Sequence, residues 1–233
     1  MSVEAYRDIF GTDINTKDGK ILHYIRSNST VLEFGPGYGR MTKYMQEILN
    51  CNVYIVEVDV DAYKYSMKYT SGGICCNILD YKWEEEFKGI LFDHIIFANV
   101  LEYLPNPQEV LERALSLLKD DGSVMLTVPN IAHSSVIIDL INNKFEYRDI
   151  GLLNKEYMRF FSYTSLIEML ENCFLVPVVQ DGTVCNPENT EFKSSYDSIK
   201  GNSDILRIRK YADVYQFVFK CIKRKYYIKN KQI

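Results

Sequence analysis

The sequence predicts an α/β fold with a seven-stranded, mostly parallel sheet and helices on both faces. Three observations predict it. Apolar runs of strand length alternate with segments of helical spacing along the chain, which is typical of repeated strand–helix units. A glycine-rich run at 35–39 joins the first apolar run to a helical pattern, as in sheets that bind nucleotides. Finally, 233 residues with 47% hydrophobic content suit one domain with a substantial core.

Seven apolar runs are the expected strands, near 30–34, 52–58, 73–76, 92–98, 123–128, 174–180 and 213–222. Helical patterns lie near 17–27, 39–49, 60–69, 107–119 and 164–172. The clearest helix start is Asn106, an N-cap residue followed by Pro107 at the first helical position and Glu109 at the third. We expect the run Asp120-Asp121-Gly122 to end that helix.

The loop after the first strand carries the main functional signal. Glycines at positions 35, 37 and 39 allow a sharp turn and a close approach of the backbone to a ligand. A dinucleotide loop of the NAD type would have its third glycine at position 40, where this chain has Arg40. The spacing therefore favours Glu-x-Gly-x-Gly-x-Gly and another nucleoside-bearing cofactor. A turn that needs glycine for geometry alone is the alternative.

A second acidic position follows the next strand. Glu57 lies at the end of the apolar run 53–57, about 20 residues past the glycine loop, where a carboxylate that binds ribose is expected. Carboxylate oxygens can accept hydrogen bonds from both ribose hydroxyls. Asp59 is the neighbouring candidate, and a solvated strand end would explain either acid alone.

With these motifs the chain resembles the class I S-adenosylmethionine-dependent methyltransferases, over about residues 20–180 and a terminal strand near 213–222. The resemblance implies a Rossmann-like sheet with an antiparallel last strand, a helical insertion after the fifth strand and S-adenosylmethionine as cofactor. The residues that it assigns to cofactor binding are Glu33, Gly35, Gly37, Gly39, Glu57, Asn77, Ile78 and Asn99.

Two positions depart from the family pattern. Asn77 stands where the family commonly has an Asp that contacts adenine, and its amide oxygen can still accept from the exocyclic amine. Asp80 is the fallback for that role. Tyr103 stands where many relatives carry His, which removes an obvious proton acceptor because a phenol has a far higher pKa. For Asn99, a buried side chain satisfied by backbone groups is the alternative to lining the cofactor pocket.

The segment 130–163 is expected to be an insertion over the cofactor that binds the methyl acceptor. It is similar to methyltransferases found with bacterial surface-polysaccharide and glycosyl-transfer functions. The acceptor expected is a small molecule or a sugar or glycan, methylated at a hydroxyl. His133 is the first candidate for a general base, although a histidine that caps a helix near 134–142 explains it equally well. Tyr103 is the second catalytic candidate, as an orienting group.

Other parts of the chain suggest fewer roles. Residues 1–29 are expected to form an N-terminal helical cap, 181–204 a surface loop and 223–233 a basic, solvated tail. Arg148 and Arg159 could hold a substrate phosphate or carboxylate, but structural ion pairs explain them better. No metal site is expected, because the three histidines lack ligand spacing and six cysteines form no Cys-x-x-Cys pair.

Charge and hydropathy restrict the partners and the compartment. The net charge of −4 argues against a nucleic-acid groove, so no DNA partner is expected. No apolar run approaches 18 residues and no signal peptide is evident, which favours the cytoplasm.

Two alternatives from other classes stay open: a non-catalytic protein that binds S-adenosylmethionine, and an NAD-dependent oxidoreductase.

Overall fold

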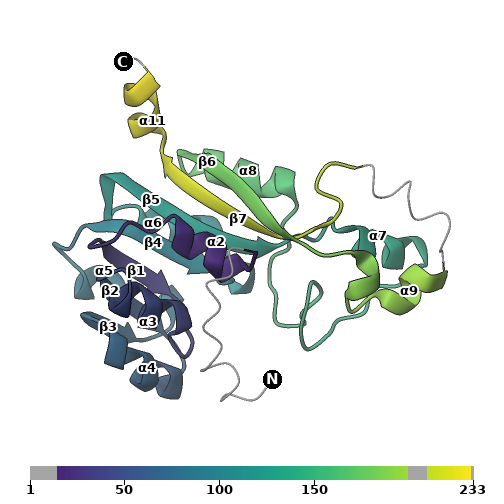
Figure 1. Ribbon diagram of the computed structural model, residues 1–233, viewed down its shortest axis with the longest axis horizontal. Coiled ribbons are helices and arrows are strands. Elements are labelled where there is room, and N and C mark those ends of the chain that lie inside the picture. Colours follow the sequence, from purple (N-terminus) through teal and green to yellow (C-terminus); the bar gives the residue numbers. More distant parts are fainter. Residues whose placement is uncertain (1–14, 199–208, 232–233) are drawn as a thin grey trace.

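The computed structural model describes residues 15–198 and 209–231 (Figure 1). Seven strands form one sheet in the order β3-β2-β1-β4-β5-β7-β6. The strands β1 to β5 run parallel, and β7 is antiparallel to both of its neighbours, β5 and β6. The predicted mostly parallel sheet with an antiparallel last strand is therefore confirmed. The strands are β1 (Thr30–Phe34), β2 (Asn52–Glu57), β3 (Gly72–Cys75), β4 (Phe92–Ala98), β5 (Leu118–Pro129), β6 (Leu175–Val184) and β7 (Val214–Lys223).

Helices cover both faces of this sheet. Successive side chains of a strand point to opposite faces, so β1 sends Leu32 and Phe34 to one apolar cluster and Val31 to the other. The first cluster lies under α5 (Lys82–Glu86), α6 (Pro107–Ala114) and α8 (Tyr163–Asn172), and the second under α2 (Lys17–His23) and α3 (Arg40–Glu47). The described residues also form the α-helices α4 (Val60–Ser66), α7 (Ser134–Ile141), α9 (Lys193–Ser198) and α11 (Arg224–Lys231).

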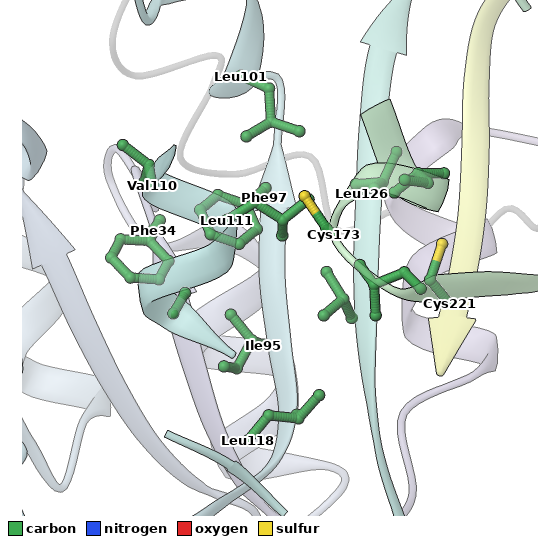
Figure 2. Packing of buried hydrophobic residues seen from close by; sticks show 14 of the residues in the cluster. Phe34, Ile95, Phe97, Leu101, Val110, Leu111, Leu118, Leu126, Cys173 and Cys221 are labelled. Atoms are coloured by element: carbon green, nitrogen blue, oxygen red, sulfur yellow. The ribbon is translucent and has the colours of Figure 1, made fainter. Parts of the chain in front are cut away.

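The first cluster is the larger core, and close packing of its side chains fixes α6 on the sheet. Figure 2 shows Phe34 and Phe97 from neighbouring strands beside Val110 and Leu111 of α6. The two phenylalanine rings are stacked with their centroids 4.6 Å apart. Packing of this kind contributes most of the stability of such a domain. It also fixes the carboxyl ends of β1 and β4 relative to each other.

A third, smaller cluster joins the insertion to the segment between β6 and α9. Val136 of α7, Leu152, Leu153 and Phe192 are fully buried together. In Figure 1, α7 and α9 accordingly lie side by side at the right, beyond the end of the sheet. The expected helical insertion after the fifth strand thus has a core of its own.

The end of α6 and the start of β5 differ from the sequence prediction. The helix expected over 107–119 ends at Ala114, and the run 120–122 lies within β5 instead of ending the helix. The helix ends early because the chain already pairs with β4 at Leu118, which lies beside Phe92. The register between β4 and β5 then shifts before Ser123. Asn106 precedes the helix as expected, yet its side chain makes no cap hydrogen bond.

The expected surface loop at 181–204 contains regular structure. Residues 181–184 extend β6 and pair with β7, and the segment then forms a 3₁₀ turn at Pro187–Asn189 and α9. Residues 199–204 lie outside the described part, as do residues 1–14 of the expected cap. Residues 224–231 of the expected tail form α11. In the described ranges, 15–198 and 209–231, no helix is long and apolar enough to cross a bilayer.

Candidate functional site

A cavity of about 510 Å³ opens at the carboxyl ends of β1, β2 and β4. This is the edge at which an open α/β sheet binds its ligand. The residues predicted from the sequence that line it are Gly35, Gly37, Glu57, Asn77, Ile78, Asn99 and Tyr103. Its walls also include Val100 and, from the insertion, Met158.

The three glycines of the loop share a backbone conformation but differ in what surrounds them. All three have positive φ angles, 63° at Gly35, 56° at Gly37 and 72° at Gly39, which favours residues without a Cβ. A Cβ on Gly35 would lie 2.9 Å from a methyl carbon of Val100, whereas a Cβ on Gly37 would meet nothing within 4 Å. Gly39 does not line the cavity, and its Cβ would lie 2.7 Å from the Cβ of Ser66. Gly39 therefore serves helix packing, as the geometric alternative anticipated.

Glu57 is fixed to this loop by hydrogen bonds. Its Oε2 accepts from the backbone N–H of Gly37 at 2.8 Å, and its Oε1 accepts from the N–H groups of Val58 and Asp59 at 2.8 and 3.0 Å. The alternative residue, Asp59, is occupied elsewhere, because its carboxylate caps α4 by accepting from the N–H of Asp61 and Ala62. The geometry favours Glu57 as the carboxylate that faces the cavity.

The segment after β3 forms the opposite wall. Asn77 accepts a hydrogen bond from the backbone N–H of Leu79 at 2.9 Å, and the indole N–H of Trp83 donates to the carbonyl of Ile78 at 2.8 Å. These bonds hold the backbone of 77–79 against the cavity. Asp80, the fallback, does not line the cavity and lies 3.4 Å from the ammonium of Lys82.

Glu33 lies beneath the glycine loop and is 1% exposed. It accepts a hydrogen bond from the hydroxyl of Thr42 at 2.6 Å, and burial raises its pKa to about 7. It lines a second cavity of about 30 Å³, together with Lys17 and Arg40. Gly35 lines both cavities, so the two adjoin at the loop.

Asn99 is held by side chains from three elements. Its amide oxygen accepts from the ammonium of Lys17 and, at 3.2 Å, from the hydroxyl of Thr127, and its amide nitrogen donates to Glu102 at 2.8 Å. Its φ is 56°. The alternative of an Asn whose side chain is satisfied by backbone groups is therefore wrong, and Asn99 joins the cavity wall to two charged residues.

Those two residues, Lys17 and Glu102, were missed in the sequence analysis. Glu102 is 1% exposed, and its Oε2 has no hydrogen-bond partner in the described part of the chain. Burial raises the pKa of Glu102 to about 7 and lowers that of Lys17 to about 8. The available signal was an acidic residue inside the apolar run Val100–Leu104, because a carboxylate rarely occupies such a place without a purpose.

Aromatic side chains of the insertion pack against Tyr103, which lines the cavity. Tyr103, 39% exposed, meets the ring of Tyr157 edge-on with the centroids 5.0 Å apart. Tyr157 contacts Phe160, which in turn contacts Phe145. The backbone N–H of Met158 donates to the carbonyl of Glu102 at 2.8 Å and so attaches the insertion to the turn after β4.

His133 is placed outside the cavity. It is fully buried and precedes α7, where its Nδ1 accepts from the backbone N–H of Ser135 at 3.2 Å. This bond assigns the proton to Nε2, which donates to the carbonyl of Cys185 at 2.8 Å. Burial lowers the pKa of the imidazole. The helix-capping interpretation thus replaces that of a general base, because no ring nitrogen is left to take a proton from an acceptor.

The two arginines of the insertion have structural contacts. The guanidinium of Arg148 lies 3.7 Å from Asp139 and over the ring of Phe192 at 4.6 Å. Arg159 is exposed and donates to the carbonyl of Met158 at 3.0 Å. Neither lines the cavity. Within residues 15–198 and 209–231, His, Cys, Asp and Glu side chains form no group of three or more suited to a metal ion.

Comparison with known proteins places this geometry in a family. A family model described as a methyltransferase domain matches residues 17–173. A SAM-dependent methyltransferase from Archaeoglobus fulgidus has a similar structure, with a TM-score of 0.64, 14% sequence identity, and 90% of this chain and 93% of that chain covered.

Two further structures show the range of chemistry on this fold. A 1,6-didemethyltoxoflavin-N1-methyltransferase from Burkholderia thailandensis, solved with S-adenosylhomocysteine, has a TM-score of 0.56 and 18% identity, with 94% and 83% of the two chains covered. The cyclase SpnF has a TM-score of 0.59 and 12% identity, with 90% and 81% covered. At such identities a likeness shows the fold alone.

Proposed function

This chain belongs to the methyltransferase domain family, and we propose that it transfers a methyl group from S-adenosylmethionine to a hydroxyl of a small molecule, a sugar or a glycan. One observation carries the assignment of the cofactor site. The glycine loop, Glu57 and Asn77 border a single cavity, and a hydrogen bond from Gly37 to Glu57 fixes the first two together.

The residues present fit this cofactor. Open space beside Gly37 lets the backbone approach a ligand, and the Glu57 carboxylate keeps lone pairs that suit ribose hydroxyls. Asn77 and Ile78 offer an amide and an apolar side chain to a base. The predicted contact of Glu33 with the methionine end of the cofactor rests on the small cavity that it lines.

The proposed chemistry is positioning. When bound, S-adenosylmethionine supplies a methyl group that is already activated for in-line displacement. The protein holds the acceptor oxygen in line with that carbon and excludes water. Tyr103, which lines the cavity mouth with its hydroxyl toward the insertion, is the proposed orienting residue. The methyl group would pass to the acceptor oxygen, the sulfur would keep the electron pair of its bond to that carbon, and the acceptor proton would pass to water at the open side of the cavity.

The proposed acceptor class rests on the insertion. The ring of Tyr103, which lines the cavity, and the ring of Tyr157 beside it offer flat apolar surfaces on which planar aromatic groups or sugar rings can pack. The resemblance to enzymes of bacterial polysaccharide metabolism favours the sugar. We propose the cytoplasm as the compartment, because all six cysteines are free thiols.

Calorimetric titration tests the proposal. S-adenosylhomocysteine is expected to bind the full chain and NAD is not. Binding of NAD alone would favour the oxidoreductase, and binding of neither would reject the cofactor site. Transfer of isotope-labelled methyl groups to a panel of sugars and phenols then separates an enzyme from a protein that only binds the cofactor.

A further inference from the structure

Two buried carboxylates near the glycine loop have no ion-pair partner within 4 Å in the described part of the chain. Glu33 and Glu102 are each 1% exposed, and in the described part of the chain neither lies within 4 Å of a Lys or Arg nitrogen. Glu33 has the hydroxyl of Thr42 as its side-chain partner, and Glu102 has the amide of Asn99. The other oxygen of Glu102 has no hydrogen-bond partner among residues 15–198 and 209–231.

The nearby cations are directed to other groups. The guanidinium of Arg40 pairs with Asp18, and the ammonium of Lys17 donates to Asn99 and lies 3.7 Å from Asp18. Lys17 of α2 therefore lies near three carboxylates, those of Asp18, Glu33 and Glu102, and Arg40 of α3 shares the small cavity with Lys17 and Glu33. Glu57 adds a further negative charge near Glu33. When all are ionised, this end of the site carries an excess of negative charge.

A buried carboxylate without a cation favours its protonated form, because the charged form has lost its hydration. Burial accordingly raises the pKa of both Glu33 and Glu102 to about 7. A ligand that places a positive charge near these two carboxylates would favour their ionised forms over their protonated forms. Each carboxylate that ionises on binding releases a proton to solvent.

We propose that Glu102, together with Glu33, makes the site prefer the positively charged cofactor over its demethylated product. This inference rests on the proposed function. S-adenosylmethionine carries a sulfonium, whereas S-adenosylhomocysteine has an uncharged thioether in its place. Both ligands carry the ammonium and carboxylate of an amino acid, so loss of the sulfonium would remove only one of the positive charges that stabilise the carboxylates, and the product would be bound more weakly than the cofactor. Glu102 does not line the cavity, and it acts from behind Asn99 as an electrostatic positioning residue.

The test titrates both ligands into the full chain by calorimetry at pH 7, in two buffers of different ionisation enthalpy. We expect wild type to release more protons with S-adenosylmethionine than with S-adenosylhomocysteine. The affinity for S-adenosylmethionine should also rise more steeply between pH 6 and 8, because ligand binding that releases protons strengthens as pH rises. Equal proton release with the two ligands would overturn the inference.

Substitution separates the electrostatic role from a structural one. Glu102→Gln keeps an oxygen that can accept from Asn99 and leaves the backbone bond to Met158 intact. It should reduce the preference for S-adenosylmethionine about tenfold, the ratio that one pKa unit represents, and Glu33→Gln should act in the same direction. Glu85→Gln, at an exposed carboxylate, is the control. An unchanged preference in both variants would contradict the charge role.

The outcomes distinguish this inference from the proposed function. If neither ligand binds wild type, the cofactor assignment fails and the inference fails with it. If both bind but Glu102→Gln changes their affinities equally, the cofactor assignment stands and Glu102 is only a structural residue. The proton count in wild type needs no variant, so a variant that failed to fold would still leave the inference tested.

Discussion

Gly37 is the residue whose backbone geometry bears most directly on ligand binding. Its φ of 56° and the open space beside it mean that a side chain there would be strained and would point into the cavity. At Gly39 the same kind of φ serves the contact with Ser66 instead. The alternate glycines of one motif thus have different functions that their spacing alone does not reveal.

Gly37→Val should abolish binding of S-adenosylhomocysteine, because its methyl groups would fill the space beside the loop. Gly89→Val is a matched control, since Gly89 also has a positive φ of 86° and open space at its Cβ but lies outside the cavity. Both variants should lose about 1–2 kcal/mol of stability from backbone strain. Calorimetry that detected unchanged binding in Gly37→Val would contradict the placement of the ligand.

Glu57→Ala should weaken S-adenosylhomocysteine binding by roughly 1.5–3 kcal/mol, because charge-assisted hydrogen bonds to ribose are removed. Asp59→Ala is the control: it removes the cap of α4 and should cost about 1 kcal/mol of stability while leaving the dissociation constant unchanged. Weakened binding in Asp59→Ala together with unchanged binding in Glu57→Ala would assign the ribose contact to Asp59.

At the scale of elements, the strand–helix units were predictable and their junctions less so. The strands β1 and β4 match their predicted ranges because their mostly apolar runs end at Gly35 and Asn99, residue types that favour turns. The run Asp120-Asp121-Gly122 was expected to end a helix, yet it lies within β5, between Leu118, which pairs with Phe92, and Ser123, which pairs with His94. Local composition cannot reveal such pairing, because the partner is not near in sequence.

The insertion illustrates the same limit for the site. His133 has the residue type and the position expected of a base, but its neighbours Ser135 and Cys185 come from α7 and from the segment after β6. Only the fold brings Cys185 next to it. Conversely, the contact of Lys17 with Asn99 joins residues 82 positions apart, and no sequence motif indicated it.

His133→Ala should destabilise the fold by about 2–4 kcal/mol, since it removes a helix cap and leaves the buried carbonyl of Cys185 unpaired. Chemical denaturation followed by circular dichroism measures the loss. Affinity for S-adenosylhomocysteine should stay within about twofold of wild type at a temperature where the variant is folded. A stable variant with lost turnover would instead restore the catalytic interpretation.

For the whole molecule, the buried acids make stability depend on pH. The pKa of Glu33 and that of Glu102 are each raised from 4.5 to about 7 in the folded chain, so the folded state binds more protons than the unfolded state between these values. Their contribution is therefore favourable at low pH and is lost as pH rises from about 4.5 through about 7.

Glu102→Gln should consequently raise the free energy of unfolding of the ligand-free protein at pH 8, by about 1–3 kcal/mol, and change it little at pH 4.5. Denaturant titrations of both proteins at the two pH values measure the difference. Equal effects at both pH values would mean that the carboxylate is not held in its protonated form by the fold.

The central claim, that the cavity at the ends of β1, β2 and β4 binds the methyl donor, is tested most directly by a crystal structure with S-adenosylhomocysteine. We predict ribose hydroxyls within hydrogen-bonding distance of Glu57, the adenine beside Asn77 and Ile78, and the sulfur facing the side of the cavity formed by Asn99 and Tyr103. A ligand bound at another place, or one whose ribose does not contact Glu57, would contradict the account.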